Sequence, residues 1–211
     1  MIAKCVQMLK LAMFDIGGVL IAYKGSWYRE YLSSVSGMGE NEFHADIDAG
    51  ITGMELGSMS LELFEKKIAE RLGIATKEVD YVGFFEKNAS LNYELLDFVR
   101  ELHTRVKTAW LSNIDPYRYA AAERMLGEGK GFFDKHYASF AMGVRKPERQ
   151  IYVSAVEPFA VRYEDVSFVD DLEENVEAAA KLGINAIRYS VFKDTESALE
   201  EKIGAMLGRS A

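Results

Sequence analysis

The sequence predicts an α/β protein built on a doubly wound parallel sheet, with four helices inserted after the first strand. Short apolar runs of strand length alternate with helical stripes, which indicates a parallel sheet covered by helices on both faces. Between residues 25 and 92 only helical periodicity is found. We therefore expect a core domain formed by residues 1–24 and 93–211, and a separate helical domain formed by residues 25–92.

The first expected strand, residues 10–14, delivers a carboxylate to a turn. Asp15 ends the apolar run, and Gly17 and Gly18 follow at once. Open parallel sheets bind ligands at the carboxyl edge of their strands, so an Asp at this place is a candidate site residue. The glycines let the backbone turn sharply and approach a ligand closely.

The insert is expected to hold four short helices that pack as a small bundle. Ser60 is the expected N-cap of the third helix and Thr76 that of the fourth. The stripes consist of apolar residues at helical spacing: Trp27, Tyr31 and Val35; Phe43 and Ile47; Leu61, Phe64, Ile68 and Leu72; Val79, Val82 and Phe85.

Four further strands are expected in the core, at residues 106–111, 136–140, 166–169 and 185–189. Helical stripes at 95–102 and 199–207 flank them. One helix is expected to begin at Asp115–Pro116, with Asp as cap and Pro at the first helical position. Another is expected to open at Lys146–Pro147, and a third to run through residues 175–180 until Gly183 stops it.

Composition excludes several classes of partner. The formal net charge of −8 argues against nucleic acid or an anionic membrane, because both are bound through clustered Lys and Arg. Cys5 is the single cysteine, so an internal disulfide is impossible and a reducing compartment is expected. No apolar run approaches membrane-spanning length. We expect a cytoplasmic protein, and its oligomeric state stays open.

Polar groups follow the expected strands at Asp15, Ser112–Asn113 and Asp170–Asp171, and Lys146 precedes a helix. Each has an ordinary structural explanation, such as beginning a turn or capping a helix. Because the carboxyl ends of parallel strands share one edge, these groups can converge into a site. Three crowded carboxylates need a divalent cation, most naturally Mg²⁺. A cation and a lysine together neutralise a phosphate dianion, and a carboxylate nucleophile can form an aspartyl-phosphate.

With these residues in this order, the chain resembles the haloacid dehalogenase-like hydrolases, which are mostly phosphatases with a Rossmann-like core. Residues 14–20 match the first motif, a strand followed by Asp-x-Asp-Gly, and residues 110–113 match the second, apolar residues followed by Ser or Thr. Residues 143–147 carry the lysine of the third motif, and residues 167–176 match the Asp-Asp of the fourth. The insert resembles this family's cap, and residues 54–60 resemble its Glu-x-Gly-x-x-Ser loop.

The resemblance implies roles for these positions. Asp15 is the expected nucleophile and metal ligand, and the carbonyl of Gly17 a second ligand. Asp171 is expected to bind the metal directly, and Asp170 directly or through water. The phosphoryl group is expected to be held by four residues: Gly18, Ser112, Asn113 and Lys146.

The chain departs from the family at Gly17, where most of these phosphatases have an Asp that protonates the leaving oxygen. Losing such a group costs about 10²–10⁴-fold in rate, and the loss is smallest for leaving groups that depart easily, such as the anomeric oxygen of a sugar 1-phosphate. A subgroup with Asp-x-Gly-Asn is similar and includes hexose-1-phosphate phosphatases, although Gly18 stands here in place of Asn. His44 and Glu55 of the cap are candidates for the missing acid, although ordinary roles, as a surface residue or in a loop hydrogen bond, explain them better.

We expect a Mg²⁺-dependent phosphatase acting on a small phosphorylated metabolite, with a sugar phosphate as one option. Two alternatives stay open. The first is dehalogenation through an Asp ester, although that subgroup has an aromatic residue in place of Gly17 and lacks the Asp-Asp pair. The second is a phospho-ligand-binding regulator that has lost turnover, for which Gly17 is the only support.

Overall fold

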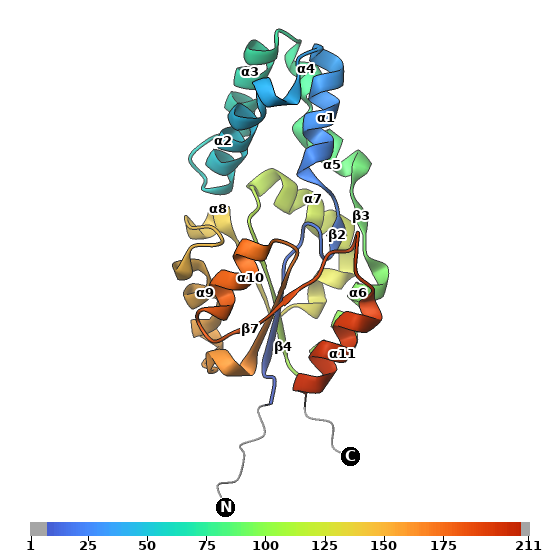
Figure 1. Ribbon diagram of the computed structural model, residues 1–211, viewed down its shortest axis with the longest axis vertical. Helices are drawn as coiled ribbons and strands as arrows, with labels where there is room; N and C mark the ends of the chain where they lie inside the picture. The colour runs from blue at the N-terminus through green and yellow to red at the C-terminus, as the bar shows by residue number, and fades with distance from the viewer. Residues whose placement is uncertain (1–7, 208–211) are drawn as a thin grey trace, which may run out of the picture.

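The computed structural model describes residues 8–207, and its centre is a five-stranded parallel sheet (Figure 1). The strands lie in the order β5 (Lys135–Ala138), β4 (Lys107–Ser112), β1 (Leu11–Phe14), β6 (Val166–Asp170) and β7 (Asn185–Arg188). From β1 the chain adds strands first on one side and then on the other, which is the order of a doubly wound fold. The order in which strands are added reverses at β1. The carboxyl end of β1 is therefore the place where such folds bind ligands.

Side chains of the sheet alternate between two apolar layers. Ala12 and Phe14 face a layer that contains α6 (Tyr93–His103), α7 (Pro116–Leu126) and α11 (Glu196–Met206). Leu11 and Met13 face the opposite layer with α9 (Arg149–Val156) and α10 (Glu173–Ala180). The three central strands β1, β4 and β6 are therefore buried on both faces, which explains their largely apolar sequences.

The inserted segment forms helices that share an apolar cluster of their own. Their bounds are α1 (Gly25–Ser36), α2 (His44–Glu55), α3 (Leu61–Leu72), α4 (Thr76–Val79) and α5 (Tyr81–Asn88). Figure 1 shows them beyond one end of the sheet, separate from the layers that cover its faces. The assignment of residues 25–92 to a distinct cap domain stays a prediction.

The fourth expected helix of the insert is divided into α4 and α5. Asp80 interrupts it with a φ of 25°, and its side chain accepts a hydrogen bond from the amide of Gly83 at the start of α5. The expected cap Thr76 is already helical, and the N-cap is Ala75, whose amide donates to the carboxylate of Glu78. The third helix begins as expected at Ser60, whose hydroxyl accepts from the amide of Leu63.

The buried face of α1 differs by one residue from the expected stripe. Tyr28 and Leu32 are buried, whereas Trp27, Tyr31 and Val35 are only partly covered. Aromatic residues on both faces of this helix make the stripe ambiguous in the sequence. The hydroxyl of Tyr28 fixes the choice, because it donates to the carbonyl of Val79.

Two short strands that periodicity did not indicate connect the core with the insert. β2 (Ile21–Ala22) precedes α1, and β3 (Ser90–Leu91) follows α5. They pair antiparallel, so the chain enters and leaves the insert through one small ribbon. Strands of two residues are too short to show an alternating pattern.

Other boundaries also differ from the expected ones. The strand expected at 136–140 ends at Ala138, where its pairing with β4 ends, and α8 (Ser139–Met142) follows. Residues 145–148 form a turn, so the helix expected from Lys146–Pro147 begins at Arg149. The 3₁₀ helices are Glu40–Glu42, Gly127–Phe132, Glu157–Phe159 and Tyr163–Asp165.

The helix start at Asp115–Pro116 is confirmed, because the carboxylate of Asp115 accepts from the amides of Tyr117 and Arg118. Cys5 lies outside the described residues. Among residues 8–207, no helix combines the length and apolar character needed to cross a membrane.

Candidate active site

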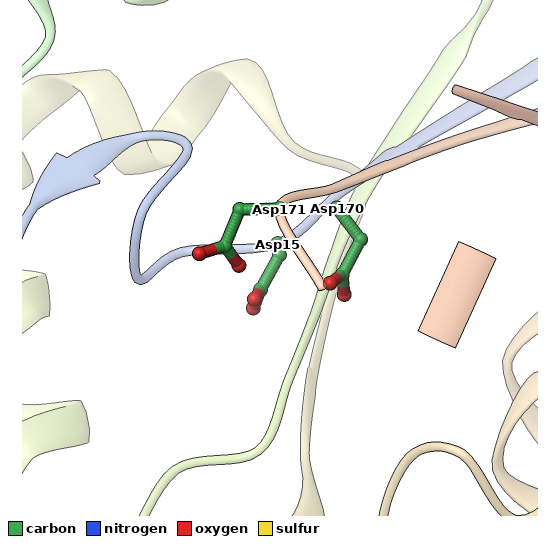
Figure 2. A group of neighbouring side chains, drawn as sticks. All are labelled: Asp15, Asp170 and Asp171. Atoms are coloured by element: carbon green, nitrogen blue, oxygen red, sulfur yellow. The ribbon is translucent and has the colours of Figure 1, made fainter. Parts of the chain in front are cut away.

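Three carboxylates meet at the carboxyl end of the central strands (Figure 2). Asp15 directly follows β1, Asp170 ends β6, and Asp171 comes next in the chain. Phe14 is in register with Val169, so the pairing of β1 with β6 brings the two aspartate segments side by side. One ligand atom from each of the three lies within 4.8 Å of the others. The cluster therefore lies at the switch point of the sheet.

Lys146 lies beneath this cluster and is fully buried. Its Nζ lies 3.0 Å from Oδ1 of Asp15, and it donates to Oδ2 of Asp170 at 2.6 Å and to the carbonyl of Leu111 at 2.9 Å. Burial by itself would lower the pKa of Lys146, but the two carboxylates outweigh burial and raise this pKa. The lysine therefore stays charged.

Asp170 is saturated by protein donors. Besides Lys146, the side-chain amide of Asn175 donates to both of its oxygens at 2.9 and 3.1 Å, and the amide of Leu172 donates to Oδ1 at 2.9 Å. Asp171 is less enclosed and lies on the other side of Asp15 in the view of Figure 2. This geometry favours Asp171 over Asp170 for direct contact with a cation.

The three carboxylates of the site carry more negative charge than Lys146 alone can neutralise. Burial raises the pKa of Asp15 well above its usual range; Lys146 opposes this shift, while Asp170 and Asp171 add to it. Burial and the neighbouring Asp170 raise the pKa of Asp171 to about 6. A cation bound between Asp15 and Asp171 would relieve both effects.

The two glycines after Asp15 serve the turn in different ways. No described residue donates a hydrogen bond to the carbonyl of Gly17, so this oxygen is free to bind a cation. Gly18 has a φ of +74°, and a Cβ there would lie 2.4 Å from Oδ2 of Asp171. Its amide already donates to the carbonyl of Ile21 at 2.8 Å. The geometry thus explains Gly18 by close packing against Asp171, and it gives no support to the phosphate contact expected for Gly18.

Ser112 ends β4 and Asn113 follows it, but only the serine side chain interacts with Asp15. Ser112 is buried, and its nearby hydroxyl has a small lowering effect on the pKa of Asp15. The side chain of Asn113 is paired with the backbone of Lys146: its amide donates to the carbonyl at 2.8 Å, and its oxygen accepts from the amide at 2.8 Å. In this structure Asn113 positions Lys146, and its side chain is not free for the expected contact with phosphate.

His44 and Glu55, the two residues of the insert considered as acids, occupy different surroundings. His44 is exposed at the start of α2. Glu55 is buried at the end of α2 and forms ion pairs with Arg118 and Arg145. A carboxylate held by two guanidinium groups would have to leave them to donate a proton. The structure therefore does not support either residue as the missing acid.

The arginine partners and Asn175 were not indicated as functional by the sequence. Arg145 lies in the segment that carries the third motif, but that motif assigns a role only to Lys146, and Arg118 lies in no motif. Asn175 offered a weak signal, because it is a polar residue in the first turn of the helix that follows Asp170–Asp171. Its buried amide is what completes the hydrogen bonding of Asp170.

The parallel sheet and the carboxylate cluster at its edge are consistent with the family that the sequence itself matches. The model of the haloacid dehalogenase-like hydrolase family matches residues 9–183, and the chain belongs to this family.

Individual relatives cover nearly the full length. The chain is 24% identical over 193 residues to D-ribitol-5-phosphate phosphatase of Bacteroides thetaiotaomicron, which is 86% of this chain and 92% of the relative. A HAD family enzyme from the same organism superposes with a TM-score of 0.79 at 23% identity, over 91% of this chain and 98% of that one. The structure of that enzyme is also known in complex with magnesium and inorganic phosphate. A HAD-like hydrolase from Porphyromonas gingivalis has a TM-score of 0.74 at 26% identity, over 93% and 98%.

Proposed function

We propose that this protein is a Mg²⁺-dependent phosphatase that hydrolyses a small phosphorylated metabolite through an aspartyl-phosphate. The observation that carries the proposal is the cluster itself: Asp15, Asp170 and Asp171 within 4.8 Å, with the ammonium group of Lys146 bound to two of them. The phosphatase named among the relatives and the magnesium–phosphate complex of the structural neighbour support the same chemistry. We further propose that residues 25–92 act as the cap of a core formed by the rest of the chain.

The residues at the site fit a small divalent cation. The donors left available are carboxylate oxygens of Asp15 and Asp171 and the carbonyl of Gly17, and hard oxygen donors are what Mg²⁺ prefers. When bound, Mg²⁺ would neutralise charge on a phosphoryl oxygen. Asp170 would act mainly through Lys146 and Asn175, since its own oxygens already accept hydrogen bonds from both.

Asp15 is the proposed nucleophile. Oδ1 of Asp15 accepts from the amide of Ile16 at 2.7 Å and lies 3.0 Å from Nζ of Lys146, so the carboxylate is held in one orientation. A carboxylate oxygen of Asp15 forms a bond to phosphorus while the bond between phosphorus and the ester oxygen breaks. The leaving alkoxide takes a proton from water, and the hydroxide so formed takes up the proton that the second, attacking water releases. Water then attacks the phosphorus, which releases inorganic phosphate and restores the carboxylate.

Lys146 and Ser112 stabilise the transferred group in this scheme. The ammonium of Lys146 supplies positive charge beside Asp15, in a buried place where electrostatic stabilisation is strong. The hydroxyl of Ser112 is close enough to Asp15 to hydrogen-bond a phosphoryl oxygen attached there. Both groups are fixed before the substrate arrives, so little reorganisation is needed during the reaction.

We propose a phosphorylated sugar or polyol as the substrate class. Support comes from the relative that acts on D-ribitol 5-phosphate and from the family resemblance of the first motif. Gly17 adds a restriction, because this position supplies no proton donor. Good leaving groups are therefore expected to react best.

Phosphate release from a panel of sugar, polyol and aryl phosphates, with Mg²⁺ and with excess EDTA, tests the proposal. We expect turnover with Mg²⁺ and almost none with EDTA. Halide release from 2-haloacids without metal would favour dehalogenation instead. Mg²⁺-dependent binding of phosphate esters with no turnover of any of them would favour the regulator.

A further inference from the structure

Glu55 joins the cap to the two core segments that carry the phosphate-binding residues. Its Oε1 lies 3.0 Å from Nη2 of Arg118, and its Oε2 lies 2.9 Å from Nη2 of Arg145. Only 5% of the residue is exposed. A buried carboxylate between two guanidinium groups interacts far more strongly than the exposed ion pairs of a protein surface.

Arg118 connects Glu55 with the segment that follows β4. Its Nε donates to Oδ2 of Asp115 at 2.6 Å, and Asp115 is fully buried at the N-cap of α7. Asp115 comes two residues after Asn113 and three after Ser112. Tyr81 of α5 closes this contact from the cap, because its hydroxyl donates to Asp115 at 3.2 Å and its ring lies 5.1 Å from the guanidinium carbon of Arg118.

Arg145 connects Glu55 with the segment that carries the lysine, because Arg145 directly precedes Lys146. Its Nη1 also donates to the hydroxyl of Thr52 on α2 at 3.3 Å, so the arginine is held by two residues of the same cap helix. The backbone of Lys146 is then fixed from the core side by its reciprocal pair with Asn113.

From these contacts we infer that Glu55 is a positioning residue: it sets the place of Ser112 and Lys146 by holding Arg118 and Arg145 against the cap. The inference rests on the proposed function of the site. It assigns Glu55 no contact with the reacting atoms and no proton transfer. A shift of about 1 Å in such groups costs up to about 10²-fold in rate, so the effect of losing Glu55 is measurable.

Removing the negative charge of Glu55 has two effects of opposite sign on the affinity for phosphate, which makes the inference testable. In Glu55→Gln the two guanidinium groups lose their counter-charge, and electrostatics alone would make the site bind phosphate more tightly. Loss of positioning would make it bind phosphate more weakly. A residue that only stabilises the fold would change the melting temperature and leave the phosphate affinity of the folded protein unchanged.

The experiment is calorimetric titration of the full-length protein with inorganic phosphate in saturating Mg²⁺, together with kcat and KM for the best substrate of the panel. We expect Glu55→Gln to weaken phosphate binding about 10- to 100-fold and to lower kcat/KM by a similar factor. The matched control is Glu86→Gln, which removes another ion pair between the insert and α7, with Arg124. The side chains of Glu86 and Arg124 are 44% and 62% exposed, so we expect phosphate affinity and kcat/KM to change by less than about twofold.

Arg145→Gln provides a second route in case Glu55→Gln does not fold, because the side chain of Arg145 is one-third exposed. It should weaken phosphate binding in the same direction. Where both single variants fold, the double variant should be no worse than the poorer single one, since both remove the same connection. Unchanged or tighter phosphate binding in folded Glu55→Gln or Arg145→Gln would overturn the inference alone. A wild-type protein without Mg²⁺-dependent phosphate binding would overturn the proposed function, and the inference with it.

Discussion

Replacing Gly17 by Asp would supply a proton donor at a position whose residue carries none. A Cβ built on Gly17 meets no atom within 4 Å, and the backbone there is outside the left-handed region. The substitution therefore costs little in packing or strain. Asp at this position would lie two residues after the proposed nucleophile Asp15, in the turn that precedes β2.

The crowding of carboxylates would favour the protonated form of the new side chain. Two unit charges about 6 Å apart repel by about 3 kcal/mol at an effective dielectric constant of about 20. In the metal-free site that repulsion corresponds to about two pKa units. Bound Mg²⁺ opposes this rise in the pKa of the added carboxyl, and the phosphate dianion of the substrate adds to it. A carboxyl with a raised pKa is what a general acid needs at neutral pH, where such a group contributes about 10²–10⁴-fold. This is about 3–5 kcal/mol of the barrier.

The assay is kcat/KM across a leaving-group series in saturating Mg²⁺. The series runs from aryl phosphates through sugar 1-phosphates to a primary alkyl phosphate such as D-ribitol 5-phosphate. We expect the unmodified protein to show a steep dependence on the pKa of the leaving group. Gly17→Asp should flatten this dependence, with a gain of about 10²-fold or more for the primary alkyl phosphate and little change for aryl phosphates.

The neighbouring glycine provides the control. Gly18→Ala would place a Cβ 2.4 Å from Oδ2 of Asp171 at a φ of +74°, so it should impair Mg²⁺ activation for every leaving group alike. A flat dependence in the unmodified protein would refute the reasoning, because it would mean that another group already donates the proton. So would a folded, Mg²⁺-binding Gly17→Asp protein with no gain for the alkyl phosphate.

Three further outcomes are expected. Asp15→Asn should keep the melting temperature within a few degrees yet abolish turnover, because an amide is a poor nucleophile; retained phosphate release by the folded variant would show that the nucleophile is another residue. Removal of Mg²⁺ with EDTA should abolish activity and added Mg²⁺ should restore it, whereas full activity in excess EDTA would contradict a role for the cation. The metal-free protein should lose stability as pH rises from about 4 through 6, because the carboxyl of Asp171 keeps its proton to about pH 6 when folded and loses it near 3.8 when unfolded. Mg²⁺ binds the ionised carboxylates, so its effect on the melting temperature should be larger at pH 8 than at pH 5, and an equal effect at both would contradict this assignment.

Local patterns in the sequence were sufficient for the fold class and for placing Asp15 and Asp170–Asp171 at one edge of the sheet. The apolar strand before Asp15 depends on burial, and the helix N-cap at Asp115 depends on hydrogen bonds between close neighbours. Parallel topology places the ends of such strands at one edge, so the meeting of Asp15 with Asp170–Asp171 could be predicted from order alone. The same local patterns were insufficient where two neighbouring faces were equally apolar, as in α1, or where one residue breaks a helix, as Asp80 does.

Only the tertiary structure decided which partner each polar group takes. Asn113 pairs with the backbone of Lys146, 33 residues away, and Glu55 pairs with Arg118, 63 residues away. No short-range pattern specifies such contacts, because they depend on how separately folded segments pack and on which donors remain unpaired once the cores are filled. For the same reason the sequence could name Asp170 and Asp171 as a pair but could not separate them. Asn175 and Lys146 occupy the oxygens of Asp170, and this leaves Asp171 available at the site.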